Sequence, residues 1–326
     1  MTAVDIVVPV WNSRHWIDDC LAALRLQTLI PRTIIVVDDG SSDGILEWLR
    51  DNAPEVQVER LAAHRGFAAA ANRGIRAATA PLVALLNVDT QADPEWLSCL
   101  ATALEDASPQ VGMAASKMLR LEAPESIDNA GDHFTHYGSA LKLGHGDPSS
   151  RWTEQRAILS ASAGAALYRR SMLDEIGLFD ESFESYLEDV ELGLRAQLAG
   201  YGAIFVPTAQ VLHQGGGSGL PRGRYVRLIT ANRVATVLHT FSAGQLWRHA
   251  LRLLWGQWYF LVASRRPWQS LLGYIDLIGR LPRVLNRRRE IQSRRRIDAA
   301  QFELQLGREL GEPPLSHLLR RWWTGP

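Results

Sequence analysis

Acidic side chains directly follow two of the three apolar runs near the N-terminus of the chain. Asp38 and Asp39 come after one run, and Asp89 follows another, with Asn87 two positions before it. A carboxylate at the end of a hydrophobic strand can hold a hard divalent cation and bridge it to phosphate oxygens. The alternative is that each aspartate only caps the turn or helix that follows it.

Further candidates for chemistry lie in the second half of the chain. Glu188 and Asp189 open a predicted helix over residues 187–198. A carboxylate there can act as a general base if the geometry allows, although both acids could simply stabilise the positive end of the helix. His213 precedes a glycine-rich loop. Together with a carboxylate it would favour Mn²⁺ somewhat over Mg²⁺, although a lone histidine is often only a packed residue.

The elements that must position these residues form an α/β pattern. Residues 6–10, 33–37 and 82–86 are rich in Val, Ile and Leu without polar alternation, and helical patterns lie between them. Such runs are typical of parallel strands covered on both faces. Since ligands of open α/β sheets lie beyond the carboxyl ends of the strands, the side chains after each run are expected in one site.

Two helices are expected between these strands, over residues 15–29 and 43–52, with Ser41 or Ser42 as the cap of the second. The pattern weakens over residues 110–160, where we expect loops and short strands that line an acceptor cleft. A last short strand is expected over residues 203–206.

Composition and charge limit the class of protein. The 326 residues are 46% apolar and formally neutral, but residues 221–326 hold 19 Arg and no Lys against 6 acids. An acidic front half suits a cation site, and a basic tail suits an anionic surface. The cysteines, Cys20 and Cys99, are expected to be free thiols in a reducing compartment. The N-terminus has the pattern of a first strand, and no apolar run is long enough to span a bilayer.

Seven motifs occur in a recognisable order: VVPVWN, VVDDGSSD, RGFAAAANRG, LLNVDT, GLFDESF, YLEDVELGLR and HQGGGSG. In this order and spacing the chain resembles bacterial family 2 glycosyltransferases of the GT-A fold, over about residues 4–235. Within that family it is most similar to rhamnosyltransferase-like and galactofuranosyltransferase-like cell-surface enzymes. The resemblance implies a GT-A domain over residues 1–235 and a helical, Trp- and Arg-rich extension over residues 236–326.

The resemblance also implies roles for individual residues. Asp89 matches the metal-binding acid of the DxD motif, with Asn87 in place of the first Asp, and His213 matches a histidine that completes the metal site. Asp189 matches the acid that takes the proton from the acceptor hydroxyl, and its neighbour Glu188 could share that work or bind acceptor hydroxyls. The cofactor is then Mn²⁺ or Mg²⁺.

The remaining candidates belong to the two substrates. Asp39 is expected against the nucleobase or ribose. Further donor-binding candidates are Pro9, Val10, Trp11, Asp38, Gly66, Asn72, Arg222 and Arg224. We expect Arg222 and Arg224 to lie on a segment that folds over the donor diphosphate, with solvated surface arginines as the alternative. Gly164 and Ala165 are expected to leave room for the acceptor.

The C-terminal segment interleaves aromatic side chains with arginines. The aromatic residues that lie between arginines include Trp247, Trp255, Trp258, Tyr259 and Trp268. This pattern favours a helix on an anionic membrane surface, near a glycan or polyprenyl-diphosphate-linked acceptor. The protein would then be cytoplasmic and peripheral on the inner face of the cell membrane. The alternatives are the core of a helical subdomain or a homo-oligomer contact, and nucleic acid ranks last.

The predicted function is therefore inverting transfer of a sugar from a nucleotide-sugar to an acceptor hydroxyl in cell-wall or surface polysaccharide synthesis. The resemblance favours dTDP-L-rhamnose as the donor. The alternatives are a UDP-sugar donor (galactofuranose, GlcNAc or glucose), a membrane-attached scaffold of the same fold without activity, and a nucleotidyltransferase. The last would usually carry a Gly- and Arg-rich N-terminal loop with a Lys, which VVPVWNSRHW lacks.

Overall fold

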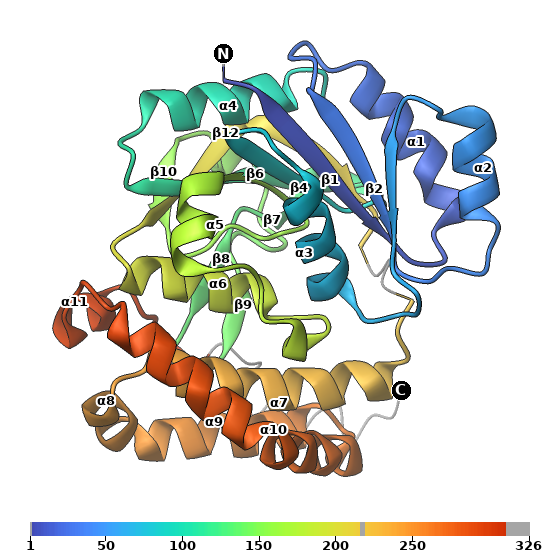
Figure 1. Cartoon of the computed structure of the whole chain (residues 1–326). Helices are drawn as coiled ribbons and strands as arrows, with labels where there is room; N and C mark the ends of the chain where they lie inside the picture. The colour runs from blue at the N-terminus through green and yellow to red at the C-terminus, as the bar shows by residue number, and fades with distance from the viewer. Residues whose placement is uncertain (1, 216–218, 311–326) are drawn as a thin grey trace. The chain divides into compact units, whose positions relative to one another are not determined.

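The computed structural model describes residues 2–215 and 219–310, and the chain divides into two compact units (Figure 1). Unit 1 comprises Met1–Asp132 and Lys142–Gly219, and unit 2 comprises His133–Leu141 and Leu220–Pro326. A short hairpin segment of the first half thus belongs with the C-terminal helices. The division into domains at residue 235 stays a prediction; that position lies inside a helix, Arg222–Thr240.

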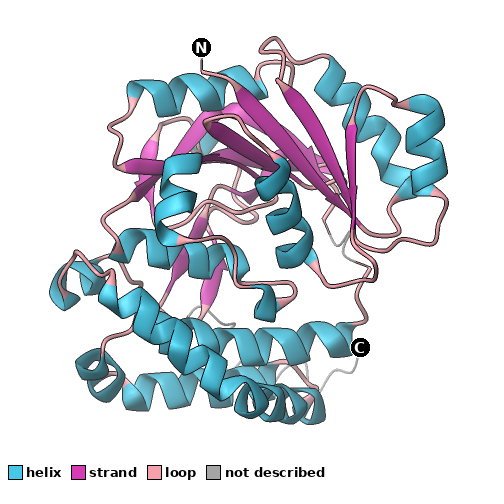
Figure 2. Cartoon of the chain, in the orientation of Figure 1, coloured by secondary structure: helices cyan, strands magenta, loops and turns pink. Residues whose placement is uncertain are grey.

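Unit 1 is built on one large mixed sheet, drawn in magenta in Figure 2. The strand order is β10-β12-β6-β11-β4-β1-β2-β3, with β5 paired to β12 and β7 to β6. The strands are β1 Val4–Val10, β2 Thr33–Asp38, β3 Gln57–Arg60, β4 Leu82–Leu86, β5 Thr90–Ala92, β6 Val111–Arg120, β7 Ala123–Asn129, β10 Arg156–Ile158, β11 Ala165–Arg169 and β12 Gly202–His213. A separate small hairpin pairs β8 (Asp132–Phe134) with β9 (Ala140–Lys142).

Helices cover both faces of this sheet because its central strands are apolar on both sides. Alternate residues of β1 point to opposite cores: Ile6 packs in the core with α1, α2 and α4, and Val7 packs in the core with α3, α5 and α6. The helices are α1 Arg14–Arg25, α2 Ile45–Asn52, α3 Phe67–Ala77, α4 Trp96–Asp106, α5 Arg170–Ile176 and α6 Glu188–Leu198, with 3-10 turns at Ser149–Arg151 and Glu181–Phe183.

The structure confirms the α/β class and three of the predicted strands and corrects five details. β1, β2 and β4 are parallel as predicted, but β11 runs antiparallel between β4 and β6. Residues 110–160 begin with the ten-residue strand β6 in the middle of the sheet, and the predicted loops and short strands follow it as β7 to β10 and their turns. β12 extends to His213, well past residue 206. α1 ends at Arg25, and the N-cap of α2 is Gly44 instead of a serine.

Unit 2 consists of helices around the hairpin tip 133–141. The helices are α7 Arg222–Thr240, α8 Ala243–Arg248, α9 Ala250–Ala263, α10 Pro267–Ser293 and α11 Ala299–Leu304. Edge-to-face contacts of Phe241 with Phe134 and with Phe302 form part of its core. Among the described residues, none of the helices combines the length and the apolar character that crossing a membrane would require.

We expect two identical substitutions in helices to have opposite effects. A Cβ atom at Gly74 in α3 would lie 2.2 Å from Cγ1 of Val7, whereas at Gly279 in α10 it would meet no described atom within 4 Å. Overpacking costs about 1–3 kcal/mol, and Ala improves helix propensity by about 1 kcal/mol. Gly74→Ala should therefore lower the free energy of unfolding measured in urea, and Gly279→Ala should raise it. Equal effects would contradict the packing of α3 on β1.

Candidate active site

Strand pairing brings the chain after β4 and the end of β12 together. β5 pairs antiparallel with β12, so that Thr90 faces His213 in register. The Gln214 N–H donates to the Asp89 carbonyl at 3.0 Å. β12 also pairs with β6, and β6 with β7, which places the end of β7 at the same edge. Residues separated by more than a hundred positions in sequence therefore share one edge of the sheet.

His213 lies between two carboxylates at this edge. Its Nε2 is 3.4 Å from Oδ2 of Asp89, and its Nδ1 is 2.8 Å from Oδ2 of Asp128. All three residues are at most 9% exposed. Because a carboxylate can only accept, Nδ1 carries a proton, and in the neutral ring the lone pair is then on Nε2, toward Asp89. A carboxylate behind a histidine in this way is the usual support of a histidine that ligates a metal.

Electrostatics in this group favour a charged Asp128 and a protonated His213. Burial is the largest single effect and works against the charged forms of both His213 and Asp128, but the hydrogen bond between them, together with the hydrogen bonds and charges of Asp89 and Lys142, outweighs it. The hydrogen bonds and charges of Asp128 and Asp89 raise the pKa of His213 to about 9. The pKa of Asp128 is held well below its ordinary value by His213 and by Lys142.

Asp128 and Lys142 were missed in the sequence. The Lys142 ammonium lies 3.0 and 3.1 Å from the two carboxylate oxygens of Asp128, and Nδ1 of His145 is 2.8 Å from the Asp128 carbonyl. All three lie in the stretch that was expected to form loops and short strands. Three polar residues, Asp128, Asn129 and Asp132, follow the apolar Ile127 within five positions. That pattern was the available signal for a buried polar strand end.

A second group surrounds Asp39 at the end of β2. Its carboxylate accepts the backbone N–H of Arg65 at 2.7 Å and of Gly66 at 2.8 Å, and it lies 2.8 Å from Nδ1 of His64. Burial raises the pKa of Asp39 although these donors oppose the shift. The ring of Trp11 stacks on His64 with centroids 3.9 Å apart. Trp11, His64 and Asp39 thus form one polar and aromatic cluster at the edge of the sheet.

Gly66 joins this cluster for a steric reason. Its φ is +89°, and a Cβ there would lie 2.6 Å from the Glu184 carbonyl oxygen. Asp38 binds differently from Asp39: it accepts from the Ser41 N–H at 2.9 Å and lies 3.3 Å from Nε of Arg60. Neither aspartate accepts from an N–H group of α2, so the alternative that both cap this helix is wrong.

Asp189 lies in the first turn of α6, and the residues just before this helix have a strained backbone. Tyr186 and Leu187 have φ values of 71° and 68°, which only glycine adopts without strain. The Asp189 carboxylate accepts from the N–H of Ala163 at 3.1 Å and from its neighbour Val190 at 2.8 Å. The withdrawal of water raises the pKa of Asp189, and these donors oppose the shift.

Two further buried acids interact with Asp189. Burial and the charges of Asp189 and Asp132 raise the pKa of Glu188 well above its ordinary value. Burial and the charge of Asp189 do the same for Asp132, which was not predicted as a site residue. Among the described residues, Oε2 of Glu188 and Oδ2 of Asp132 have no hydrogen-bond partner. Like charges in a buried site oppose one another's ionisation, so burial and repulsion both favour the neutral forms of Glu188 and Asp132.

The other predicted site residues of unit 1 have the following places. Asn87 donates its N–H to the Gly164 carbonyl at 2.8 Å, so these two lie together. Ala165 begins β11 and is buried. Asn72 is bonded to Phe179 and Glu181 and so anchors the segment before α6. Pro9 and Val10 end β1, with Val10 in the core.

Arg222 and Arg224 lie in the first turn of α7, in unit 2. Of the glycine loop before them, residues 216–218 lie outside the described residues, so the predicted lid stays a prediction. Both cysteines are free, as predicted.

Comparison with known proteins agrees with this architecture. The family named Glycosyl transferase family 2 matches residues 5–177, more than half of the chain. The N-acetylglucosaminyl-diphospho-decaprenol L-rhamnosyltransferase of Mycobacterium tuberculosis (strain CDC 1551 / Oshkosh) is 28% identical over 230 residues, which cover 64% of this chain and 75% of that protein. The O-antigen biosynthesis protein RfbC of Myxococcus xanthus is 26% identical over 223 residues, 64% of this chain but 17% of RfbC.

Two solved structures share the fold. GalNAc-T7, determined with UDP, GalNAc and Mn²⁺, superposes with a TM-score of 0.68 at 16% identity, covering 94% of this chain and 56% of that one. The mannosyltransferase PcManGT from Pyrobaculum calidifontis, in complex with GDP-Man and Mn²⁺, gives 0.52 at 18% identity, with 93% and 87% covered. At such identities the likeness shows the fold alone. The family match shows that this chain is a glycosyltransferase of family 2, and the likeness to the solved structures shows that it has the GT-A fold.

Proposed function

We propose that this protein is a metal-dependent, inverting glycosyltransferase that moves a sugar from a nucleotide-sugar to an acceptor hydroxyl in cell-wall or surface polysaccharide synthesis. The observation that carries the proposal is His213 between Asp89 and Asp128, a buried imidazole whose Nε2 faces a carboxylate while Nδ1 is held by another. This donor set suits Mn²⁺ or Mg²⁺. When bound, the cation neutralises the charge that develops on the departing diphosphate.

Charge balance ties the metal to the donor. Lys142 offsets the charge of Asp128, and Asn87 adds none. His213 would give up its Nε2 proton to bind a metal ion, and Asp89 would then be the main carboxylate left to neutralise the ion. One carboxylate leaves much of the charge of a divalent cation unneutralised. Mg²⁺ sites of this kind draw on substrate phosphates as further ligands. We therefore expect the cation to bind far better in the presence of the nucleotide-sugar than alone.

Asp189 is the proposed general base. It would accept the proton of the acceptor hydroxyl as the hydroxyl oxygen attacks the anomeric carbon, and the bond to the diphosphate oxygen breaks on the opposite face. The N–H of Ala163 and the turn before α6 orient its carboxylate. Glu188, Gly164 and Ala165 are proposed to contact the acceptor.

Asp39 and its neighbours are proposed to hold the nucleoside. The cluster offers an aromatic face at Trp11 and polar groups at Asp39 and His64, a combination that suits a base and a ribose. Arg222 and Arg224 would neutralise the diphosphate. The similarity to a decaprenol-linked rhamnosyltransferase supports dTDP-L-rhamnose as donor and a polyprenyl-diphosphate-linked acceptor, with UDP-sugars as the alternative.

The C-terminal helices carry apolar stripes, which support attachment to the inner face of the cell membrane. Trp247 near the end of α8 is 86% exposed, and Leu251 and Leu254, three positions apart on one face of α9, are 83% and 67% exposed. The stripe of α10 comprises Trp268, Leu271, Leu272, Ile275, Ile278, Leu281 and Leu285. Exposed arginines lie beside these stripes, which suits anionic headgroups. Tyr259, in contrast, is buried and belongs to the core of unit 2.

The first test is donor turnover. Wild-type protein, Asp89→Ala and Asp128→Asn are assayed for binding and hydrolysis of dTDP-rhamnose, UDP-galactofuranose, UDP-GlcNAc, UDP-glucose and GDP-mannose with Mn²⁺, Mg²⁺ or EDTA. One donor should respond to metal, and Asp89→Ala should abolish the response. Asp128→Asn should weaken metal-dependent activity about 10–100-fold, because it removes the support of His213.

The matched control is Glu125→Gln, an exposed carboxylate on the same strand as Asp128, which should behave as wild type. Silence of folded wild-type protein toward every donor with metal present would favour the inactive scaffold. A response that survives Asp89→Ala would remove the proposed metal site.

The second test concerns the base. Asp189→Asn should lower kcat of transfer by about 10²–10⁴-fold while donor binding remains. The raised pKa of Asp189 keeps it protonated at higher pH than an ordinary aspartate, so the base is lost as the pH falls. The acid limb of kcat/KM should therefore lie above about pH 4. Asp174→Asn, an exposed aspartate on α5, is the control, and equal rates for the two variants would exclude this role.

The third test concerns the membrane. The triple variant with Trp247, Leu251 and Leu254 each changed to Gln should bind anionic phosphatidylglycerol vesicles more than roughly tenfold more weakly, because each exposed side chain contributes about 1.5–3 kcal/mol when buried. Ile30→Gln removes an apolar side chain of unit 1 that is 84% exposed and should have no effect. Unchanged vesicle binding, or equal binding to DNA, would contradict this part of the proposal.

A further inference from the structure

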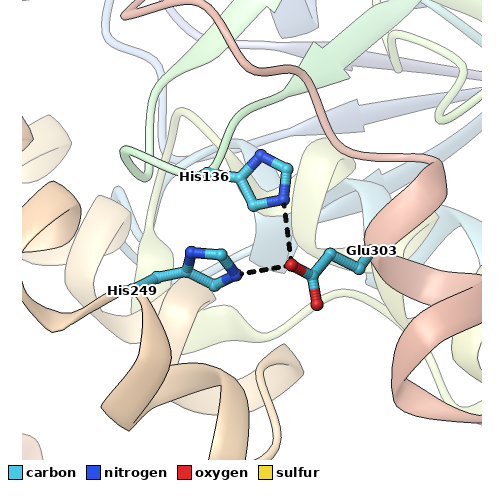
Figure 3. Close-up of side chains that lie close together, drawn as sticks. All are labelled: His136, His249 and Glu303. Atoms are coloured by element: carbon cyan, nitrogen blue, oxygen red, sulfur yellow. Dashed lines mark hydrogen bonds and ion pairs between the residues drawn. The ribbon is translucent and has the colours of Figure 1, made fainter.

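Two histidines and a glutamate meet inside unit 2, outside the proposed active site. His136 comes from the hairpin tip, His249 from the junction of α8 and α9, and Glu303 from α11 (Figure 3). The two histidines are 4% and 1% exposed. One potential ligand atom from each residue lies within 4.8 Å of the others. Neither the motifs of the family nor the matched range of residues 5–177 include this group in full.

The hydrogen bonds of His136 leave a lone pair directed at an anion. Its Nδ1 lies 2.6 Å from the carbonyl oxygen of Gly307, which can only accept, so Nδ1 carries a proton. In the neutral ring Nε2 therefore has a lone pair, and it lies 3.8 Å from Oε1 of Glu303. This distance is too long for a hydrogen bond. A nitrogen lone pair and a carboxylate oxygen repel each other unless a cation lies between them.

The spacing of the three atoms suits a transition-metal ion. Oε1 of Glu303 is 3.8 Å from Nε2 of His136 and 2.9 Å from Nε2 of His249. Ligand atoms of a tetrahedral Zn²⁺, with bonds of about 2.0–2.1 Å, lie roughly 3.3 Å apart. Two histidines and one glutamate are a known zinc ligand set that leaves the fourth position to water. The Gly307 carbonyl behind His136 corresponds to the outer-shell acceptor that usually orients such a histidine.

There is room for the remaining ligand. His136 and Glu303 line a pocket of about 400 Å³, together with Tyr137, Arg252 and Arg308 among other residues. A pocket of this size admits water to the group. The ligands come from three segments that are far apart in sequence, so one ion there would join α11 to the hairpin tip and to α9.

We propose that His136, His249 and Glu303 form a second metal site, separate from Asp89 and His213, that binds a divalent ion of the Zn²⁺ type and stabilises unit 2. Two side chains must give way to the ion. Arg252 donates to Nδ1 of His249 at 3.2 Å, and Arg248 is paired with Oε2 of Glu303 at 2.9 Å. Both arginines are exposed and can turn into solvent as His249 moves its proton to Nδ1. This site is independent of the proposed sugar transfer.

The experiment counts bound zinc in chelator-treated protein by equilibrium dialysis and elemental analysis. The whole chain is used in an Asp89→Ala background, which removes the other candidate site. This variant should bind about one Zn²⁺ per chain, and Co²⁺ in its place should give the intense visible absorption of a four-coordinate ion. Adding Glu303→Gln should abolish both signals. Zinc should raise the thermal midpoint of the Asp89→Ala protein and not that of the double variant.

Arg248→Gln is the matched control, because it removes the ion pair of Glu303 and keeps all three ligands. In the same background it should bind zinc as tightly or more tightly. His136→Gln serves as the second ligand variant if Glu303→Gln does not fold, as judged by circular dichroism. Absence of zinc from folded Asp89→Ala protein at micromolar metal would overturn the proposal. Zinc binding that persists in a folded ligand variant would also overturn it.

Discussion

The pairing of β12 with both β6 and β5 is the constraint on which the candidate site depends. β12 is a 12-residue strand that ends at His213. Its register against β5 fixes His213 beside Asp89, and β6 with β7 brings in Asp128. The backbone hydrogen bonds between these strands thus fix the positions of Asp89, Asp128 and His213 relative to one another. Burying an imidazole and two carboxylates costs free energy of desolvation. The hydrogen bonds among them can offset this cost only if the backbone holds the three groups at the right distances.

A second cost is concentrated before α6. Glu184, Tyr186 and Leu187 are non-glycine residues with positive φ just before α6. The buried acids Glu188 and Asp189 follow them and repel each other and Asp132 of β8. None of these features stabilises the fold. Contacts with the surrounding structure must hold such a segment in its strained conformation. Asn72 contributes by binding Phe179 and Glu181, and Gly66 contributes by allowing close approach to Glu184. Residues of the nucleoside-side motifs therefore also act as supports for the segment that carries Asp189.

The features that could be predicted from the sequence are those that depend on local residue patterns and on the order of motifs. Apolar runs located β1, β2 and β4, and the ordered motifs indicated the family, which the match to residues 5–177 confirms. The sequence did not predict β6, because its Gly, Ser and Lys dilute the apolar pattern of a strand that is nevertheless buried. Asp128 was missed for a different reason: its place beside His213 depends on the β6–β7 register, which is a long-range property. The antiparallel direction of β11 is likewise fixed by its connections and not by its residues.

The features of the chain differ in how far similarity to known proteins supports them. The family match ends at residue 177, so the roles proposed for Asp189 and His213 depend on geometry more than those for Asp39 and Asp89 do. The two proposals for unit 2 are supported by its own side chains. The membrane proposal depends on the exposure of its apolar stripes, and the metal proposal depends on the positions and the tautomer of its two buried histidines. Exposed tryptophan and leucine side chains lower the solubility of a protein. Burying two imidazoles beside a carboxylate costs free energy, because these polar groups lose their contact with water. Such costs persist in a native chain when a ligand offsets them, and a lipid surface and a metal ion would do so independently of each other.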